Sequence, residues 1–221
     1  MTGRDRVAHL MRQLASAACR CPAHSHTFHQ GIANRALRPV LGIVDPLHTL
    51  HMPSRVAANS GFDVLCHALE SYTALPYSDS VCVHGMSYPI AGNVKTYRAK
   101  EYSVDHPVVP HGLSVVVTSP AVFSFTASMC PDRHLEAAQI LGADISNVKR
   151  ADAGSILADT LRSFLFDLQV DDGLSALGYN KDDIPALVKG TLPQERVTKL
   201  SPRPHTEEDL TELFTASMKL Y

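Results

Sequence analysis

The region from Pro107 to the C-terminus most constrains the fold, because its apolar residues recur every three or four positions and no run alternates as a strand would. The pattern is clearest over residues 152–170, where the predicted buried face consists of Leu157, Leu161, Phe164, Leu165 and Leu168. Glycine or proline separates the expected helices at Pro131, Gly142, Gly173, Gly178 and Pro193. We therefore expect a mainly α-helical fold.

The last helix has its own start signal. Thr206-Glu207-Glu208-Asp209 forms a capping-box arrangement. The residues that follow predict one apolar face made of Leu210, Leu213, Phe214 and Met218. We expect this helix to pack against the others.

The net charge and the lengths of the apolar runs argue against two classes of partner. The 221 residues include 20 basic and 22 acidic side chains, and the net charge of -2 offers no footprint for nucleic acid. No apolar run approaches the ~18 residues of a membrane-spanning helix. The five cysteines are odd in number and lack paired spacing, which favours a reducing compartment. We expect a small-molecule ligand, and neither nucleic acid nor membrane as a partner.

Residues 1–37 differ from the rest of the chain. Apolar residues at helical spacing lie among arginines, and Asp5 is the only acidic residue near them. This pattern is typical of a mitochondrial transit peptide and predicts the matrix, with a short surface helix as the alternative. His24, His26 and His29 follow in a polar stretch that is more typical of a disordered linker than of a metal-binding tract. We expect the folded domain over residues 38–221.

The start of this domain has a short apolar, β-branched run over residues 39–46 that ends in Asp-Pro, which predicts one buried strand. Ser54 is the expected N-cap of a helix that begins near Arg55. A second helix is expected over residues 62–72.

The second of these helices contains two metal-binding residue types. Asp63 and His67 are four positions apart and therefore project from the same helix face. A carboxylate oxygen and an imidazole nitrogen together suit Fe(II), Zn(II) or Mn(II). By itself this spacing more often gives a simple side-chain pair, so the evidence from these two residues alone is weak.

Two His-Gly pairs strengthen the interpretation. His84-Gly85 and His111-Gly112 each precede an apolar stretch, and the glycine lets backbone approach the histidine closely. The candidate ligands are then Asp63, His67, His84 and His111. Such a set can leave coordination positions for a substrate oxygen, which is the Lewis-acid arrangement for polarising an alcohol or carbonyl.

The segments GFDVLCHALESYTALP, VHGMSYPIAG and VPHGLSVV resemble, in the same order, three motifs of the iron-containing alcohol dehydrogenase family. The resemblance implies the helical metal-binding domain of the dehydroquinate synthase-like fold, with the predicted strand as a remnant of an α/β domain. It also implies one divalent iron, with zinc as the alternative, bound by Asp63, His67, His84 and His111.

Two further segments, VDHPVVPHGLSVVVTSPAVF and GTLPQERVTKLSPRP, resemble mitochondrial members of the family. They imply hydroxyacid-oxoacid transhydrogenation, in which 4-hydroxybutyrate oxidation is coupled to 2-oxoglutarate reduction through bound NAD. Small hydroxy and oxo acids are then the expected substrates.

The chain departs from the family pattern in three places. It has no Gly-Gly pair and no G-x-G-x-x-G motif, so no residue is assigned to NAD binding and none to catalysis. The bridge over residues 77–83 stands where relatives have long helices, and its length decides whether His84 reaches the other ligands. Tyr88 stands where many relatives have a second histidine.

These departures leave the function open. We expect little or no transhydrogenase activity from the 221-residue chain. The alternative is a non-catalytic metal-binding or interaction isoform that associates with full-length subunits through an exposed apolar face. A metal hydrolase is a third reading, in which Glu70 is the only candidate general base.

Overall fold

The computed structural model describes residues 41, 45, 47, 49–74, 82–194 and 201–221. The chain divides into two units, Met1–Leu47 and His48–Tyr221. Most of the first unit, with the transit-like segment and the greater part of the predicted strand, lies outside the described residues. The predicted boundary between residues 37 and 38 therefore stays a prediction.

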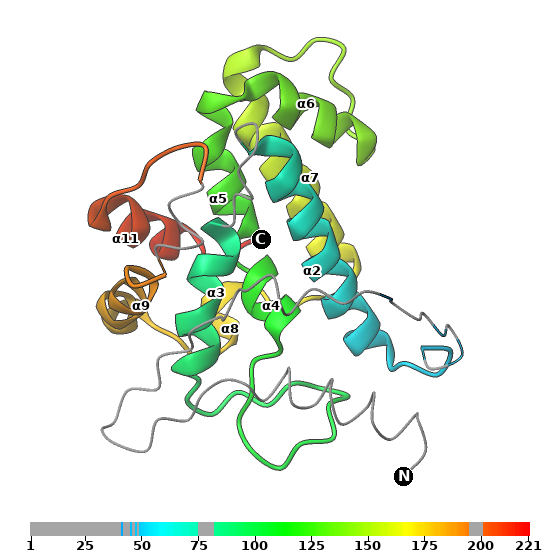
Figure 1. Ribbon diagram of the computed structural model, residues 1–221, viewed down its shortest axis with the longest axis vertical. Coiled ribbons are helices and arrows are strands. Elements are labelled where there is room, and N and C mark those ends of the chain that lie inside the picture. Colours follow the sequence, from blue (N-terminus) through cyan, green and yellow to red (C-terminus); the bar gives the residue numbers. More distant parts are fainter. Residues whose placement is uncertain (1–40, 42–44, 46, 48, 75–81, 195–200) are drawn as a thin grey trace. The chain divides into compact units, whose positions relative to one another are not determined.

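Within the described residues this unit is helical and contains no sheet, so the expected mainly α-helical class is confirmed (Figure 1). A single parallel bridge joins Arg98 to Val108. The α-helices are α2 (Ser54–Thr73), α3 (Cys82–Gly92), α4 (His111–Val116), α5 (Ser119–Thr126), α6 (Pro131–Ile140), α7 (Ala153–Asp167), α8 (Gly173–Ala176), α9 (Ile184–Thr191) and α11 (Glu207–Ala216). The short 3₁₀ helices are η3 (Ala127–Met129), η4 (Arg150–Asp152) and η5 (Lys181–Asp183). None of the described helices has both the length and the hydrophobicity needed to cross a membrane.

Helix α2 corrects the expectation of two separate helices over residues 55–72. It runs unbroken from Ser54 to Thr73, and Pro53 rather than Ser54 occupies the N-cap position. The acceptor for its first turn comes from a distant loop, because Glu101 accepts hydrogen bonds from the Arg55 N–H at 2.9 Å and from the Ser54 hydroxyl. A carboxylate at this end also suits the helix dipole. Local sequence could not reveal a cap supplied 46 residues away.

Helix α7 contributes one buried face to a core that all the larger described helices share. Leu157, Leu161 and Leu165 are fully buried, and Phe164 is partly buried against the same cluster. Helices α5 and α6 pack on α7. Leu168 was expected on the buried face but is 51% exposed. The reason is that α7 ends at Asp167, so Leu168 leaves the helical spacing that would have turned it inward.

The capping box at the start of α11 is confirmed. The Thr206 hydroxyl accepts a hydrogen bond from the Asp209 N–H at 3.1 Å, and the Asp209 carboxylate accepts one from the Thr206 N–H at 2.7 Å. This reciprocal pair satisfies two backbone donors that a helix start otherwise leaves unpaired. Leu210, Leu213 and Phe214 are buried, as the pattern predicted, and α11 packs on α9.

Thr206→Ala is therefore expected to destabilise the protein by about 1 kcal/mol, the usual cost of losing an N-cap side chain. Urea unfolding followed by circular dichroism measures this free energy. The matched control is Thr211→Ala, an exposed position in the same helix whose hydroxyl bonds only to a carbonyl one turn back. Equal unfolding free energies for the two variants would show that the capping box contributes nothing.

Helices α2, α3 and α4 pack against one another, and this meeting point carries the candidate ligands (Figure 1). Gly112, in α4, lies so close to α2 that a Cβ there would be 1.9 Å from the Asn59 carbonyl oxygen. The expectation that glycine beside a histidine permits close backbone approach is confirmed at this position. The contact sets how near the start of α4 comes to Asp63.

Candidate metal site

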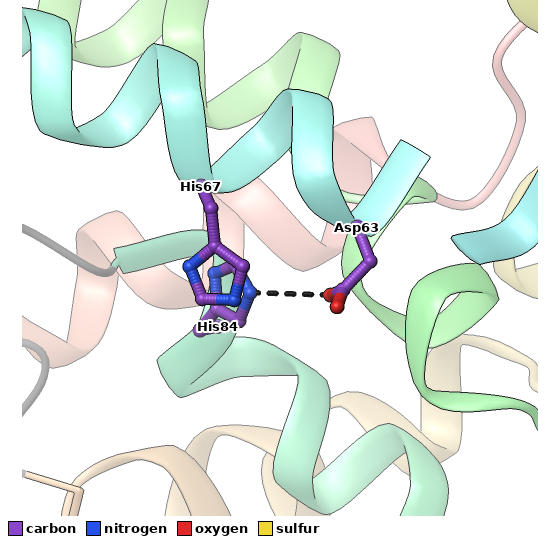
Figure 2. Close-up of side chains that lie close together, drawn as sticks. All are labelled: Asp63, His67 and His84. Carbon is purple, nitrogen blue, oxygen red and sulfur yellow. Dashed lines mark hydrogen bonds and ion pairs between the residues drawn. The ribbon is translucent and has the colours of Figure 1, made fainter. Parts of the chain in front are cut away.

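Helix α2 supplies the first two predicted ligands. Asp63 and His67 lie one turn apart and both project toward α3 (Figure 2). The Asp63 side chain is 26% exposed, and His67 lies at the exposed edge of the helix. Cys66 and Leu69, on the other side of the same turns, are buried in the core. The helix therefore presents an oxygen and a nitrogen at the boundary between core and solvent.

His84 supplies the third group, from the first turn of α3. Its ring is buried, and its Nε2 atom lies 3.3 Å from Asp63 Oδ1. The ring also stacks on His67, with the centroids 3.8 Å apart and the planes inclined by 29°. One donor atom from each of Asp63, His67 and His84 lies within 4.8 Å of the others. His84 is thus within reach of both α2 residues (Figure 2).

His111 is the first residue of α4 and approaches the same carboxylate from the other side. Its Nε2 atom lies 3.5 Å from Asp63 Oδ1, and its ring centroid lies 5.6 Å from that of His84. About half of the His111 side chain is exposed to solvent. Asp63 thus lies near all three predicted histidines, with His67 and His84 inside the cluster of mutually close donor atoms and His111 at its edge.

Electrostatics favour neutral imidazoles at two of the three histidines. Burial and the neighbouring His84 lower the pKa of His67, although Asp63 opposes this. Burial lowers the pKa of His111 in the same way, again against Asp63. At His84 burial also lowers the pKa, but the hydrogen bond and charge of Glu70, together with Asp63, raise it overall. Neutral imidazole is the form that binds a metal ion.

Glu70 is a site residue whose role the sequence did not reveal. It lies on the buried side of α2 and is 3% exposed. Its Oε2 lies 2.5 Å from His84 Nδ1, and its Oε1 accepts the Val83 N–H at 2.7 Å. Burial raises its pKa overall, although the hydrogen bond and the charge of His84 oppose the rise. Because both oxygens face buried donors, the geometry does not favour Glu70 as a general base for a hydrolase.

Two buried thiols lie close to the site without joining it. Cys66 is on α2 and Cys82 begins α3, and both are free cysteines. Burial raises the pKa of Cys66 well above its usual value and raises that of Cys82 to about 12. A thiol binds metal as its thiolate. The donor set is therefore one of oxygen and nitrogen.

Tyr88 follows His84 by one turn of α3, and its ring centroid lies 6.5 Å from that of His111. It thus lies beside His111, which is one of the two exposed candidate ligands.

Comparison with known proteins identifies relatives. The family model described as Fe-containing alcohol dehydrogenase family, C-terminal, matches residues 105–218. This segment contains His111, while Asp63, His67 and His84 precede it. The mitochondrial hydroxyacid-oxoacid transhydrogenase of Xenopus tropicalis is 57% identical over 258 residues, covering 86% of this chain and 56% of that protein. The Homo sapiens protein of the same name is 55% identical over the same length, covering 86% and 55%.

These matches are longer than the chain itself. An alignment of 258 residues exceeds 221, so the relatives contain internal segments with no counterpart here. Their place is not fixed by the length of the match, so the expected shortening near residues 77–83 stays a prediction. The chain spans about half the length of the curated relatives it matches, with 56% of the Xenopus tropicalis protein covered.

Solved structures show the same fold at low sequence identity. A 1,3-propanediol oxidoreductase superposes with a TM-score of 0.67 at 18% identity, covering 78% of this chain and 54% of that one. An alcohol dehydrogenase from Oenococcus oeni gives a TM-score of 0.66 at 17% identity, covering 78% and 54%. The helical arrangement is therefore shared with these enzymes.

Proposed function

Because this chain belongs to the Fe-containing alcohol dehydrogenase family, we propose that its helical unit binds one divalent metal ion through Asp63, His67, His84 and His111. The observation that carries the proposal is the cluster of Asp63, His67 and His84, whose donor atoms lie within 4.8 Å of one another, together with His111 Nε2 at 3.5 Å from Asp63 Oδ1. The donor set of one carboxylate and three imidazoles fits Fe(II) and also Zn(II). Iron is the proposed metal because of the family, and zinc is the alternative.

The donor geometry supports this fit. Asp63 places Oδ1 within 3.3 Å and 3.5 Å of two histidine nitrogens, at distances that a shared ion could bridge after small side-chain movements. His84 directs Nε2 toward this point because its Nδ1 is held by Glu70. The half-exposed His111 leaves one side of the site accessible to a small molecule.

The proposed substrates are small hydroxy and oxo acids, by analogy with the names of the relatives. A divalent ion held at this site would polarise the substrate oxygen, which makes an alcohol easier to deprotonate. The four side chains would hold the ion, and the exposed His111, beside Tyr88, would leave room for that oxygen. The full reaction, 4-hydroxybutyrate oxidation coupled to 2-oxoglutarate reduction in mitochondria, also needs a nicotinamide to carry the hydride. We assign no residue of this chain to that cofactor.

We therefore expect the purified 221-residue protein to hold close to one metal ion per chain and to turn over little or no substrate. Metal content by mass spectrometry, NAD binding by calorimetry and transhydrogenase turnover beside a full-length relative measure the three properties. Turnover at the rate of the full-length protein would contradict the second expectation. A folded protein that takes up neither iron nor zinc would contradict the first.

A non-catalytic role is the second candidate, and one observation favours it. The side chains of α2 and α7 line an apolar groove of about 380 Å³, which includes Phe62, Leu65, Phe164 and Leu168. Such a surface suits association with a full-length subunit. Co-purification of the two chains, with NAD bound only by the full-length partner, would favour this role over independent catalysis.

A further inference from the structure

Glu70 has no role in the proposed coordination, yet it is among the most buried charged residues that the structure describes. Its carboxylate lies between α2 and α3 with an exposure of 3%. One oxygen faces His84 Nδ1 at 2.5 Å, and the other accepts the Val83 N–H at 2.7 Å. Burying a carboxylate is costly unless its hydrogen bonds are satisfied, and here both oxygens have partners. This placement calls for an explanation beyond packing.

The hydrogen bond to His84 has a consequence for the opposite side of the ring. A neutral imidazole carries one hydrogen, so one nitrogen donates and the other has a free lone pair. An ionised carboxylate can only accept, so the shared hydrogen lies on Nδ1 of His84. Nε2 lies 3.3 Å from Asp63 Oδ1, which is also an acceptor, so a hydrogen on Nε2 is the one that a metal ion displaces, while Nδ1 keeps its own.

We propose that Glu70 is a positioning residue, which keeps the hydrogen of His84 on Nδ1 and leaves Nε2 open to a divalent metal ion. This proposal rests on the metal site proposed above. The second oxygen of Glu70 adds to the effect, because its bond to Val83 ties the carboxylate to the residue before the histidine. Side chain and backbone of the first turn of α3 are thereby fixed by one group on α2. In metal sites, a carboxylate that accepts a hydrogen bond from the non-coordinating ring nitrogen of a histidine acts in this way.

The variant Glu70→Gln tests the role with little change in shape. A carboxylate offers two acceptors, whereas an amide offers one acceptor and one donor. The amide can therefore satisfy the Val83 N–H or the His84 Nδ1–H, but not both. If its NH₂ faces the ring, the hydrogen of His84 must move to Nε2, which blocks that nitrogen. We expect Co²⁺ to bind the variant about 10–100-fold more weakly than the wild type.

Glu136→Gln is the matched control, because Glu136 is a carboxylate that bonds to Tyr72 on the surface and lies outside the site. Co²⁺ titration by calorimetry and thermal unfolding are measured on all three proteins. Weaker Co²⁺ binding in Glu70→Gln alone, with the fold retained, supports the proposal. A folded Glu70→Gln protein that binds Co²⁺ as tightly as the wild type overturns it.

A measurement on the metal-free wild type keeps the proposal testable even if Glu70→Gln does not fold. Nitrogen-15 NMR of the His84 ring reports which nitrogen carries the hydrogen. Hydrogen on Nδ1, with or without a second one on Nε2, supports the role of Glu70, whereas a ring whose only hydrogen is on Nε2 overturns it. Wild-type protein that binds no Co²⁺ would refute the proposed metal site instead, so the two failures are distinguishable.

Discussion

Gly112→Ala is expected to destabilise the protein by about 3 kcal/mol or more, because the new Cβ cannot be accommodated without moving a helix. A Cβ at this position would be 1.9 Å from the Asn59 carbonyl oxygen and 2.6 Å from its carbon, both of them backbone atoms of α2. No change of side-chain rotamer relieves such a contact, so α4 must shift away from α2. Thermal or urea unfolding measures the loss.

Gly61→Ala is the matched control, since Gly61 is also a helical glycine, in α2, but a Cβ there has no neighbour within 4 Å. Alanine in an exposed helix interior is favoured over glycine by roughly 0.5–1 kcal/mol, so this variant should be slightly more stable than the wild type. The same Gly→Ala substitution should therefore lower the free energy of unfolding at position 112 and raise it at position 61. An unfolding free energy for Gly112→Ala within the error of the wild type would contradict the close packing of α2 and α4.

The same variant should also weaken metal binding. Gly112 follows His111, and its Cβ would also come within 3.3 Å of the Asp63 Cβ. A shift of α4 that relieves the clash carries His111 away from Asp63. Loss of stability and loss of metal affinity are thus expected together in Gly112→Ala, and neither in Gly61→Ala.

Asp63→Ala is expected to reduce the affinity for a divalent metal by more than about 100-fold, beyond the usual effect of removing a supporting residue. Asp63 is the only anionic group among the four candidate ligands, and it is the group that the histidines of both α3 and α4 approach. Its removal leaves three imidazoles without a counter-charge. Metal content after purification and Co²⁺ titration of the metal-free protein measure the effect.

Asp105→Ala is a suitable control because it removes a carboxylate that also pairs with a histidine. Asp105 lies 3.1 Å from His106 on the exposed surface, in a loop outside the three helices that carry the site. Metal binding should be unchanged in this variant. If Asp63→Ala retained its affinity within a factor of about three, the carboxylate would not be a ligand and the proposed coordination would be wrong.

Local sequence determined the helices and the identities of the candidate ligands. Apolar spacing identified the buried face of α7, and the capping box located the start of α11, because both signals arise within a few residues of one helix. The same reasoning placed Asp63 and His67 on one helix face. Leu168 was misassigned because spacing does not specify where a helix ends.

Only the tertiary structure decided whether these groups meet. Glu101 caps α2 from 46 residues away, and Gly112 sets the distance between α4 and α2; neither effect follows from neighbouring residues. His84 lies beside Asp63 because α3 packs across α2, and Glu70 supports its ring because the buried side of α2 faces the start of α3. Ligand identity is a property of residue type, whereas coordination depends on distances of a few ångströms between separate helices, which only packing sets.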